Sequence, residues 1–524
     1  MLLRSLPEDI LAVVLRQCVC GSYSQGNSLK CSLPLLAVCR QWRRLAAPMV
    51  CGHVYVQYGD RPTRGDGTFI RSPSAAEPAD VAVKTNLDLI AMAGCARAVR
   101  RVQVDVHYMA NPFQGWREVV QRMRAVATSW RAVELTVAMH PVFSALDASS
   151  VDLARHADDI AEVSDALAAL VPGVRRLECG GTGNSPVARS LYGRLASHYA
   201  DQLQRLLSRH PIAVPPDCRF ARLKKLDISY DRAAGYRLPQ MAAGELVDMR
   251  LLHWPPSHSW APFSTGRDSR VVAFAELKRL RVVYGGARLE DGAALRHRGG
   301  HPWKLHFPSL KHLDVHCSQG TCPLLEYAVL PSRMESISIH TTSVAYRDIA
   351  NLALPATKRL SLCISPKSRG DPAGLPAINR ILESARGCEI VELDVHDRAL
   401  AVAPESISCA ALTHLQVRAP TGVDTVLALI ERLPNLVRMA FYDLDLSGIQ
   451  TDMSVPDADE STAVEPLHTS LASLAINYDT ERHSPDTALG VVKYLLLRIP
   501  TLTELIAIQA PNSPVVGFVE AYAP

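Results

Sequence analysis

The sequence predicts an α/β protein in which a small N-terminal helical module is followed by an irregular solenoid of strand-and-helix repeats. The parallel sheet is expected on the concave face of the solenoid and the helices on its convex face. Three observations lead to this fold class. The motif apolar-x-x-apolar-x-apolar recurs from Val99 to the C-terminus, helical segments separate its copies, and hydrophobic (48%) and charged (21%) residues occur in ordinary globular proportions.

The first expected element is a helix from Ser5 to Leu15. Pro7 is tolerated in a first helical turn, and the acidic residues Glu8 and Asp9 suit the positive end of the helix dipole. One face of this helix is apolar and carries Ile10, Leu11, Val14 and Leu15.

A polar loop over residues 21–32 separates this helix from a second one over Leu33–Pro48. Leu36, Cys39 and Trp42 recur at helical spacing, and Arg40, Arg43 and Arg44 are available for the outer side. Two helices of this size bury little apolar surface by themselves, so we expect the module to pack on a partner or on the rest of the chain.

The two halves of this module together resemble an F-box. The resemblance rests on Leu6-Pro7-Glu8-Asp9-Ile10 followed by Leu15, and on the segment LLAVCRQWRRL at residues 35–45. It implies a three-helix module that docks on the adaptor subunit of a cullin-RING ubiquitin ligase. The adaptor contacts that it implies are Leu6, Pro7, Ile10, Leu11, Leu36, Val38, Trp42 and Leu45. The alternative is that the helices only cap the N-terminal end of the solenoid.

The recurring motif predicts one strand per copy, and its best copies resemble leucine-rich repeats. These copies are LKKLDI (223–228), LKRLRV (277–282), LKHLDV (310–315) and LTHLQV (412–417). The middle apolar residues of all copies are Val102, Val133, Leu177, Leu226, Met249, Leu280, Leu313, Ile337, Leu360, Leu393, Leu415, Met439, Leu474 and Leu505. Helices are expected between them at Trp116–Trp130, Leu153–Leu170, Leu191–Leu207, Ala373–Ala385, Val423–Leu433 and Ala488–Ile499.

These elements give the expected organisation of the chain. The helical module takes residues 1–55, a linker and N-terminal cap 56–96, the repeats 97–510 and a C-terminal tail 511–524. Three segments rich in Pro, Gly, Ser and charge are expected to be flexible insertions, at residues 60–79, near 255–268 and near 451–466.

Side chains alternate along a strand, so the residue between the last two apolar positions of each motif points into the concave groove. Eleven of the fourteen residues at this position are polar, which supports the register. The groove is therefore expected to select a protein client by charge complementarity. The predicted client-binding residues are Asp227, Arg250, Arg281, Asp314, His316, His340, Asp394, Gln416 and Arg418.

One step further along the strands, the groove-facing positions read His316, His340, Cys363 and His396. Such a ladder spreads its ligands along a line, whereas structural zinc takes a tetrahedron, so a solvated polar column is favoured over a zinc site. The pair Gly180-Gly181 lacks the spacing of a phosphate-binding loop and is expected to form an ordinary turn between repeats.

Composition and missing motifs exclude several classes. The net charge of +4 is not gathered into a wide basic face, which argues against nucleic-acid binding, and no apolar run is long enough for a membrane span. No motif places a nucleophile beside a base, so neither catalysis nor a cofactor or metal is expected. Thirteen irregularly spaced cysteines indicate a reducing compartment, the cytoplasm or the nucleus.

The favoured function is that of a non-catalytic substrate-receptor subunit of a multisubunit ubiquitin ligase, monomeric on its own. It would join the ligase adaptor to a protein client that the sequence does not identify. The alternative is a repeat scaffold that binds proteins without ubiquitin chemistry. An enzyme built on the groove would need paired titratable groups, and the sequence offers none.

Overall fold

The computed structural model describes part of the chain, and all structural statements below concern that part. It comprises residues 10–15, 40–59, 83–108, 112–141, 153–181, 186–210, 212–215, 217–229, 239, 242, 244–254, 264–265, 270–271, 274–285, 305–317, 328–344, 354–366, 387–395, 411–446, 466–478 and 483–507. The predicted helix Ala373–Ala385 and the predicted C-terminal tail lie outside it, as do residues 60–79 and nearly all of 255–268 and 451–466.

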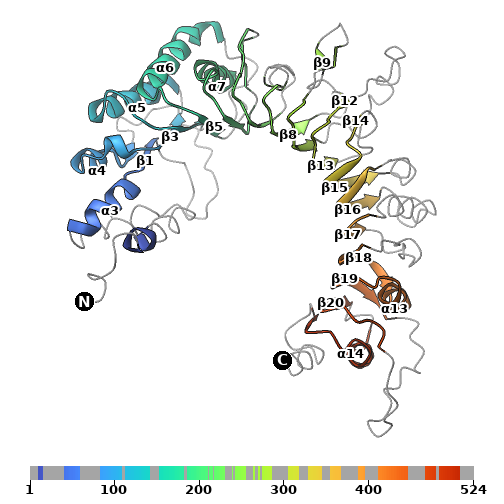
Figure 1. Cartoon of the computed structure of the whole chain (residues 1–524). Helices are drawn as coiled ribbons and strands as arrows, with labels where there is room; N and C mark the ends of the chain where they lie inside the picture. Colours follow the sequence, from blue (N-terminus) through green and yellow to red (C-terminus); the bar gives the residue numbers. More distant parts are fainter. Residues whose placement is uncertain are drawn as a thin grey trace, which may run out of the picture. The chain divides into compact units, whose positions relative to one another are not determined.

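The protein is an α/β protein whose main sheet contains 17 strands that are mostly parallel. The chain divides into two compact units, Met1–Leu246 and Val247–Pro524, and each unit carries part of the sheet (Figure 1). The predicted α/β class with a parallel sheet is therefore confirmed. A long open sheet of this kind is compatible with a solenoid.

The N-terminal module consists of the helical residues 10–15 and helix α3 (Arg40–Val50). Leu11, Leu15 and Ala46 form a small buried cluster, and Leu45 and Met49 pack against it. The structure thus brings the two helical segments together, and the N-terminal parts of both predicted helices lie outside the described residues.

The first unit holds seven strands of the main sheet. Strand β1 pairs with β3 in parallel, and the parallel order continues through β4, β5 and β6 to β7, while β2 joins the other side of β1 in antiparallel orientation. The strands are β1 (His53–Tyr58), β2 (Val83–Thr85), β3 (Arg101–Tyr108), β4 (Glu134–Pro141), β5 (Arg176–Gly181), β6 (Arg205–Ser208) and β7 (Lys225–Ser229).

Helices follow several strands of the first unit and cover one face of its sheet (Figure 1). Helix α5 contacts β1 and β3, and α5, α6 and α7 pack on one another in succession because each presents an apolar side. Trp116, Leu167 and Tyr192 are fully buried in these helices. The helical elements are α4 (Leu87–Met92), η2 (Ala96–Ala98), α5 (Pro112–Val126), η3 (Leu153–His156), α6 (Ala157–Leu170) and α7 (Pro186–His198).

The second unit holds ten strands of the main sheet, all paired in parallel from β8 to β21. They are β8 (Asp248–Trp254), β11 (Arg279–Tyr284), β13 (His312–Cys317), β15 (Arg333–Val344), β16 (Ala356–Pro366), β17 (Ile390–Val395), β18 (His414–Gly422), β19 (Arg438–Asp445), β20 (Ser473–Tyr478) and β21 (Glu504–Ala507). Two small pairs stand apart from the main sheet, β9 (Ser264–Thr265) with β10 (Arg270–Val271) and β12 (Leu305–His306) with β14 (Ala328–Val329).

Two helices of the second unit confirm the predicted segments near residues 423–433 and 488–499. Helix α13 (Val423–Arg432) follows β18 directly and buries Val426 and Leu429. Helix α14 (Pro485–Arg498) is capped at its N-terminus by Ser484, whose hydroxyl accepts a hydrogen bond from the backbone N–H of Thr487.

The strands align through one buried apolar column, as the motif predicts. In the second unit, Met249, Leu280, Leu313, Ile337 and Leu360 lie opposite one another on successive strands. Their buried side is occupied by apolar residues at every second position, and the residues between them are half-buried. We call the side that carries these half-buried residues the open face of each unit.

Four details of the predicted elements were wrong. The column contains Leu135 instead of Val133 and Val391 instead of Leu393. Both errors are shifts of two residues, which keep every side chain on the same face of the strand and so leave the hydrophobic pattern unchanged. The sheet begins at β1, well before residue 97, and β6 occupies the end of the segment predicted as helix Leu191–Leu207.

Candidate functional site: the open face of the sheet

The predicted client-binding residues lie on the open face of their units. Eight of them belong to the second unit and one, Asp227 on β7, belongs to the first. All are half-buried except Arg418, which is exposed. The eight residues of the second unit are Arg250, Arg281, Asp314, His316, His340, Asp394, Gln416 and Arg418.

In the second unit these residues form two adjacent columns across the strands. One column contains Arg250, Arg281, Asp314, Ser338, Ser361, Glu392 and Gln416. The next contains His316, His340, Cys363, Asp394 and Arg418.

The position of Asp394 corrects the sequence prediction. It was expected in the column of Asp314, where Glu392 stands instead, and His396 was expected beside Cys363. Both errors follow from the two-residue shift at Leu393: Glu392 takes the predicted place of Asp394, and Asp394 takes that of His396. His396 lies outside the described residues.

Opposite charges on this face are paired with one another. Arg281 Nε lies 3.1 Å from Asp314 Oδ2, and Arg418 Nη1 lies 3.8 Å from Asp394 Oδ2. The guanidinium of Arg418 also lies over the ring of Tyr442, 4.5 Å from its centroid. These basic and acidic side chains of the open face therefore balance one another's charge.

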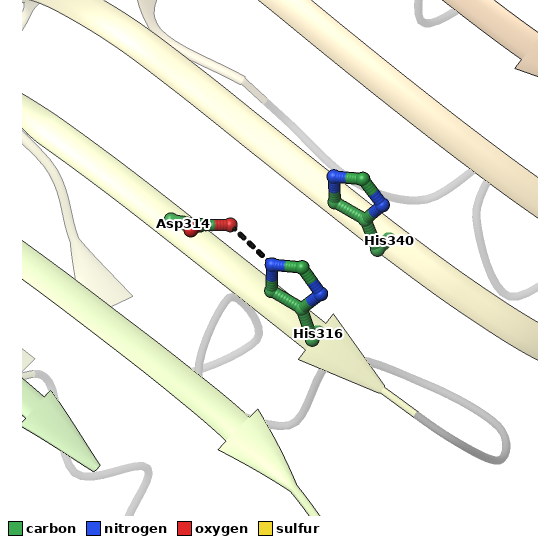
Figure 2. A group of neighbouring side chains, drawn as sticks. All are labelled: Asp314, His316 and His340. Atoms are coloured by element: carbon green, nitrogen blue, oxygen red, sulfur yellow. Dashed lines mark ion pairs between the residues drawn. The ribbon is translucent and has the colours of Figure 1, made fainter. Parts of the chain in front are cut away.

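Asp314, His316 and His340 come together on the neighbouring strands β13 and β15 of this face. His316 Nε2 lies 2.8 Å from Asp314 Oδ1, and the rings of His316 and His340 are stacked with their centroids 4.2 Å apart and their planes within 2°. Figure 2 shows the two rings side by side on neighbouring strands, with the carboxylate beside the ring of His316. The three side chains offer ligand atoms that could hold a metal ion.

The protonation states at this centre follow from burial and neighbouring charges. Burial alone would raise the pKa of Asp314, but the contact with His316 and the charge of Arg281 outweigh it and lower the pKa below its ordinary value. Burial and the neighbouring His316 lower the pKa of His340. Burial and the carboxylate of Asp394 raise the pKa of Cys363, so this thiol stays protonated and is a poor nucleophile.

The first unit has a polar hollow on its open face that sequence reasoning missed. Its volume is about 300 Å³, and Glu134 lies at its centre, with Oε2 2.7 Å from Arg101 and Oε1 2.6 Å from Arg176. Arg205 lies on the next strand, and its guanidinium can receive an acidic group. The hollow is lined by Arg101, Gln103, Glu134, Leu135, Thr136, Arg176, Leu177, Glu178, Arg205 and Leu207.

A signal for this hollow was present in the sequence. Arg101, Glu134, Arg176 and Arg205 each open a strand, one position before the buried column of that strand. Since that position faces the same side as the predicted groove residues, it belongs to the open face as well. The prediction did not extend the groove to this third column.

The predicted adaptor contacts lie partly in the described residues. Leu11 is fully buried and Leu45 is half-buried, both in the apolar cluster of the module, whereas Ile10 is 47% exposed. Two further apolar residues of the same short helix, Val13 and Val14, are also exposed. Leu6, Pro7, Leu36 and Val38, as well as the side chain of Trp42, lie outside the described residues.

Comparison with known proteins adds no further constraint. The sequence matches no protein-family model, and a search of curated proteins found no match. Within the described residues, no helix is long and apolar enough to cross a membrane.

Proposed function

We propose that this protein is the non-catalytic substrate-receptor subunit of a multisubunit ubiquitin ligase of the F-box type, with irregular leucine-rich repeats. The N-terminal module binds the ligase adaptor, and the open face binds a protein client. The sequence resemblance suggests this role. The observation that carries it in the structure is the exposed apolar face of the N-terminal helix.

That face is formed by Ile10, Val13 and Val14. Residues spaced three and four positions apart lie on one side of a helix, so these three side chains form one apolar strip. The neighbouring side of the helix, with Leu11 and Leu15, is already buried within the module. The single apolar face predicted for Ile10, Leu11, Val14 and Leu15 is thus divided into a buried and an exposed part. A helix whose two sides are both apolar is suited to packing on a second partner, and helix-in-groove docking uses this spacing.

The adaptor contact that we propose centres on Ile10, with Val13 and Val14 beside it. Leu11 and Leu45 hold the helix on α3 and position this strip. Leu6, Pro7, Leu36, Val38 and Trp42 complete the contact in the F-box resemblance.

The client contact that we propose is the open face of the sheet. Its strands present charged and polar side chains at regular spacing. The ion pairs Arg281–Asp314 and Arg418–Asp394 can be replaced by ion pairs with the client. Cys363 lies beside the carboxylate of Asp394, but its raised pKa keeps it as a thiol. We therefore assign this face to recognition and place the transfer of ubiquitin on other subunits of the ligase.

Co-expression of the full chain with a ligase adaptor tests the proposal. We expect a stoichiometric complex that co-purifies, and we expect Pro7→Ala combined with Trp42→Ala to abolish it. Trp42 belongs to helix α3, so its substitution can also disturb the fold of the module. A second variant, Ile10→Asp combined with Val14→Asp, changes only exposed residues and should weaken the complex as well. A folded chain that never co-purifies with the adaptor would contradict the proposal.

One observation favours a scaffold whose helices only cap the sheet. Helix α3 runs almost directly into β1: the N–H of Cys51 bonds to the carbonyl of Ala47 at 2.7 Å, and both residues are buried. In that case the module would be a fixed part of the first unit. A binding measurement with the adaptor distinguishes the two functions, since a scaffold without ligase function does not bind the adaptor.

A further inference from the structure

Three potential metal ligands converge on the open face of the second unit. Asp314 and His316 are two residues apart on β13, so their side chains project from the same side of the strand. His340 on β15 is the register partner of His316. One ligand atom from each residue lies within 4.8 Å of the other two (Figure 2).

The three groups form a triangle and not a line. The histidines alone would give a ladder along the sheet, which is a poor arrangement for zinc. Asp314 lies off that ladder, two residues before His316 on β13, and brings an oxygen beside the ring of His316. Two imidazole nitrogens and one carboxylate oxygen are a common ligand set for Zn²⁺ at sites that keep a fourth position open.

One oxygen of the Asp314 carboxylate lacks a well-aligned hydrogen-bond donor. Asp314 Oδ1 is shielded from solvent and has no hydrogen-bond partner of good geometry among the described residues, although His316 Nε2 is only 2.8 Å away. Arg281 contacts the other oxygen, Oδ2, at 3.1 Å and helps to fix the carboxylate. Its Nη2 also lies 3.3 Å from His316 Nε2, so metal binding requires the guanidinium to withdraw from that nitrogen.

The protonation states suit a cation. The pKa of Asp314 is lowered, so the carboxylate is ionised at neutral pH. The pKa of His340 is lowered as well, so its ring offers a nitrogen lone pair at neutral pH. Metal ligation by histidine requires this neutral form.

A second stacked pair shows that stacking alone does not make such a site. The rings of His107 and His140 in the first unit lie 4.3 Å apart and nearly parallel. Both are buried, and among the described residues no carboxylate completes a group of three there. Asp105 also stands two residues before His107, but it does not form a group of three ligand atoms with the two rings. The position of the carboxylate relative to the stacked rings therefore distinguishes the second unit.

We propose that Asp314, His316 and His340 bind a Zn²⁺ ion whose fourth coordination position faces the open side of the sheet. In the metal-bound form His316 carries its proton on Nδ1, which leaves Nε2 and Asp314 Oδ1 as ligand atoms. The two stacked rings turn toward the ion, which brings the three ligand atoms to bonding distance. The fourth position is filled by water and can be taken by a donor side chain of a bound protein. Metal binding itself does not depend on the proposed ligase function.

Titration of the full, chelator-treated and reduced chain with Zn²⁺, followed by calorimetry, tests this site. We expect one binding step whose Kd rises at least about tenfold in Asp314→Asn and in His340→Gln. His312→Gln is the matched control, because His312 is a half-buried histidine on the open face of the same strand. We expect this control to keep the wild-type Kd.

Cobalt substitution separates this site from thiol sites, since the chain has thirteen cysteines. Co²⁺ at the proposed site should give visible bands without thiolate charge transfer, and Asp314→Asn should remove those bands. Asp314→Asn preserves the shape of the side chain, so its thermal transition should show a folded protein. Zinc binding that is absent in the wild type, unchanged in both ligand variants, or equally weakened in His312→Gln would overturn the proposal.

Discussion

Glu134 pairs with two arginines on the open face of the first unit. Its carboxylate lies between Arg101 and Arg176 on the two flanking strands, and it is much less exposed than either arginine. Burial alone would raise the pKa of Glu134, but the hydrogen bond and charge of Arg101 and the contact with Arg176 outweigh it and lower the pKa. The carboxylate therefore stabilises the fold in its ionised form.

The substitution Glu134→Gln should reduce the free energy of unfolding by about 1 kcal/mol at pH 7, since both arginines are half exposed. Because the pKa is lower in the folded state, the stabilisation is complete above the unfolded value of about 4.3 and is lost as the pH falls through the folded value. Urea unfolding at pH 7 and pH 3 measures this. Equal stability of variant and wild type at pH 7 would contradict the prediction.

His53, at the start of β1, should make stability fall in mild acid. Burial, followed by the charge of Arg101, lowers its pKa to about 4, against the opposing effect of Glu134. The unfolded chain binds the proton below a pH of about 6.5, whereas the folded chain resists it until about pH 4. Stability is therefore fully present above pH 6.5 and declines between these two values, by roughly 3 kcal/mol in total.

Urea unfolding of wild type and His53→Gln at pH 7.5 and pH 4.5 isolates this contribution. The variant should lose less stability between the two pH values than the wild type, because glutamine takes up no proton. An identical loss in both proteins would show that His53 is not responsible.

Strand β5 ends at Gly181 for a steric reason. Its φ of +126° is a conformation that side-chain-bearing residues rarely adopt, and a Cβ there would lie 1.9 Å from the carbonyl oxygen of Met139. Tyr192 of α7 links the ends of β4 and β5, since its hydroxyl donates a hydrogen bond to Gly180 O and accepts one from Met139 N. Both glycines belong to β5 itself, so the predicted turn at Gly180-Gly181 was wrong.

The substitution Gly181→Ala should cost about 1–3 kcal/mol of unfolding free energy, because it adds a strained φ and a backbone clash. Gly180→Ala is the matched control, since a Cβ at Gly180 would meet only Ala138 Cβ at 3.9 Å. Thermal unfolding of both variants measures the difference. If the two substitutions lowered the Tm equally, the proposed strain at Gly181 would be refuted.

The helices were predicted best where the chain separates them clearly from the next strand. Helix α13 ends near Leu433, as predicted, and a turn follows before β19. Helix α7, in contrast, ends at His198, although the predicted helix continued to Leu207. Strand β6 has only four residues, and its leucines continue the apolar spacing of the helix before it. Periodicity cannot separate a short strand from a helix end in such a case.

For the molecule as a whole, the sequence could predict a parallel sheet with an apolar buried side, because the strand motif repeats. It could not fix every register, since a shift of two residues at Val133 and at Leu393 satisfies the same alternation. It also placed His316 and His340 on neighbouring strands correctly. It did not join Asp314 to the two histidines as the third ligand of the proposed zinc site, because it treated each column of side chains separately.

The most direct test of the proposed function is a titration of the purified ligase adaptor into the full chain. The proposal predicts saturable binding at one adaptor per chain and a Kd at least about tenfold weaker in Ile10→Asp combined with Val14→Asp. The control Met92→Asp charges an apolar residue that is 88% exposed outside the module, and it should bind like the wild type. A folded chain that binds no adaptor, or one that binds equally well in all three forms, would contradict the docking of the N-terminal helix.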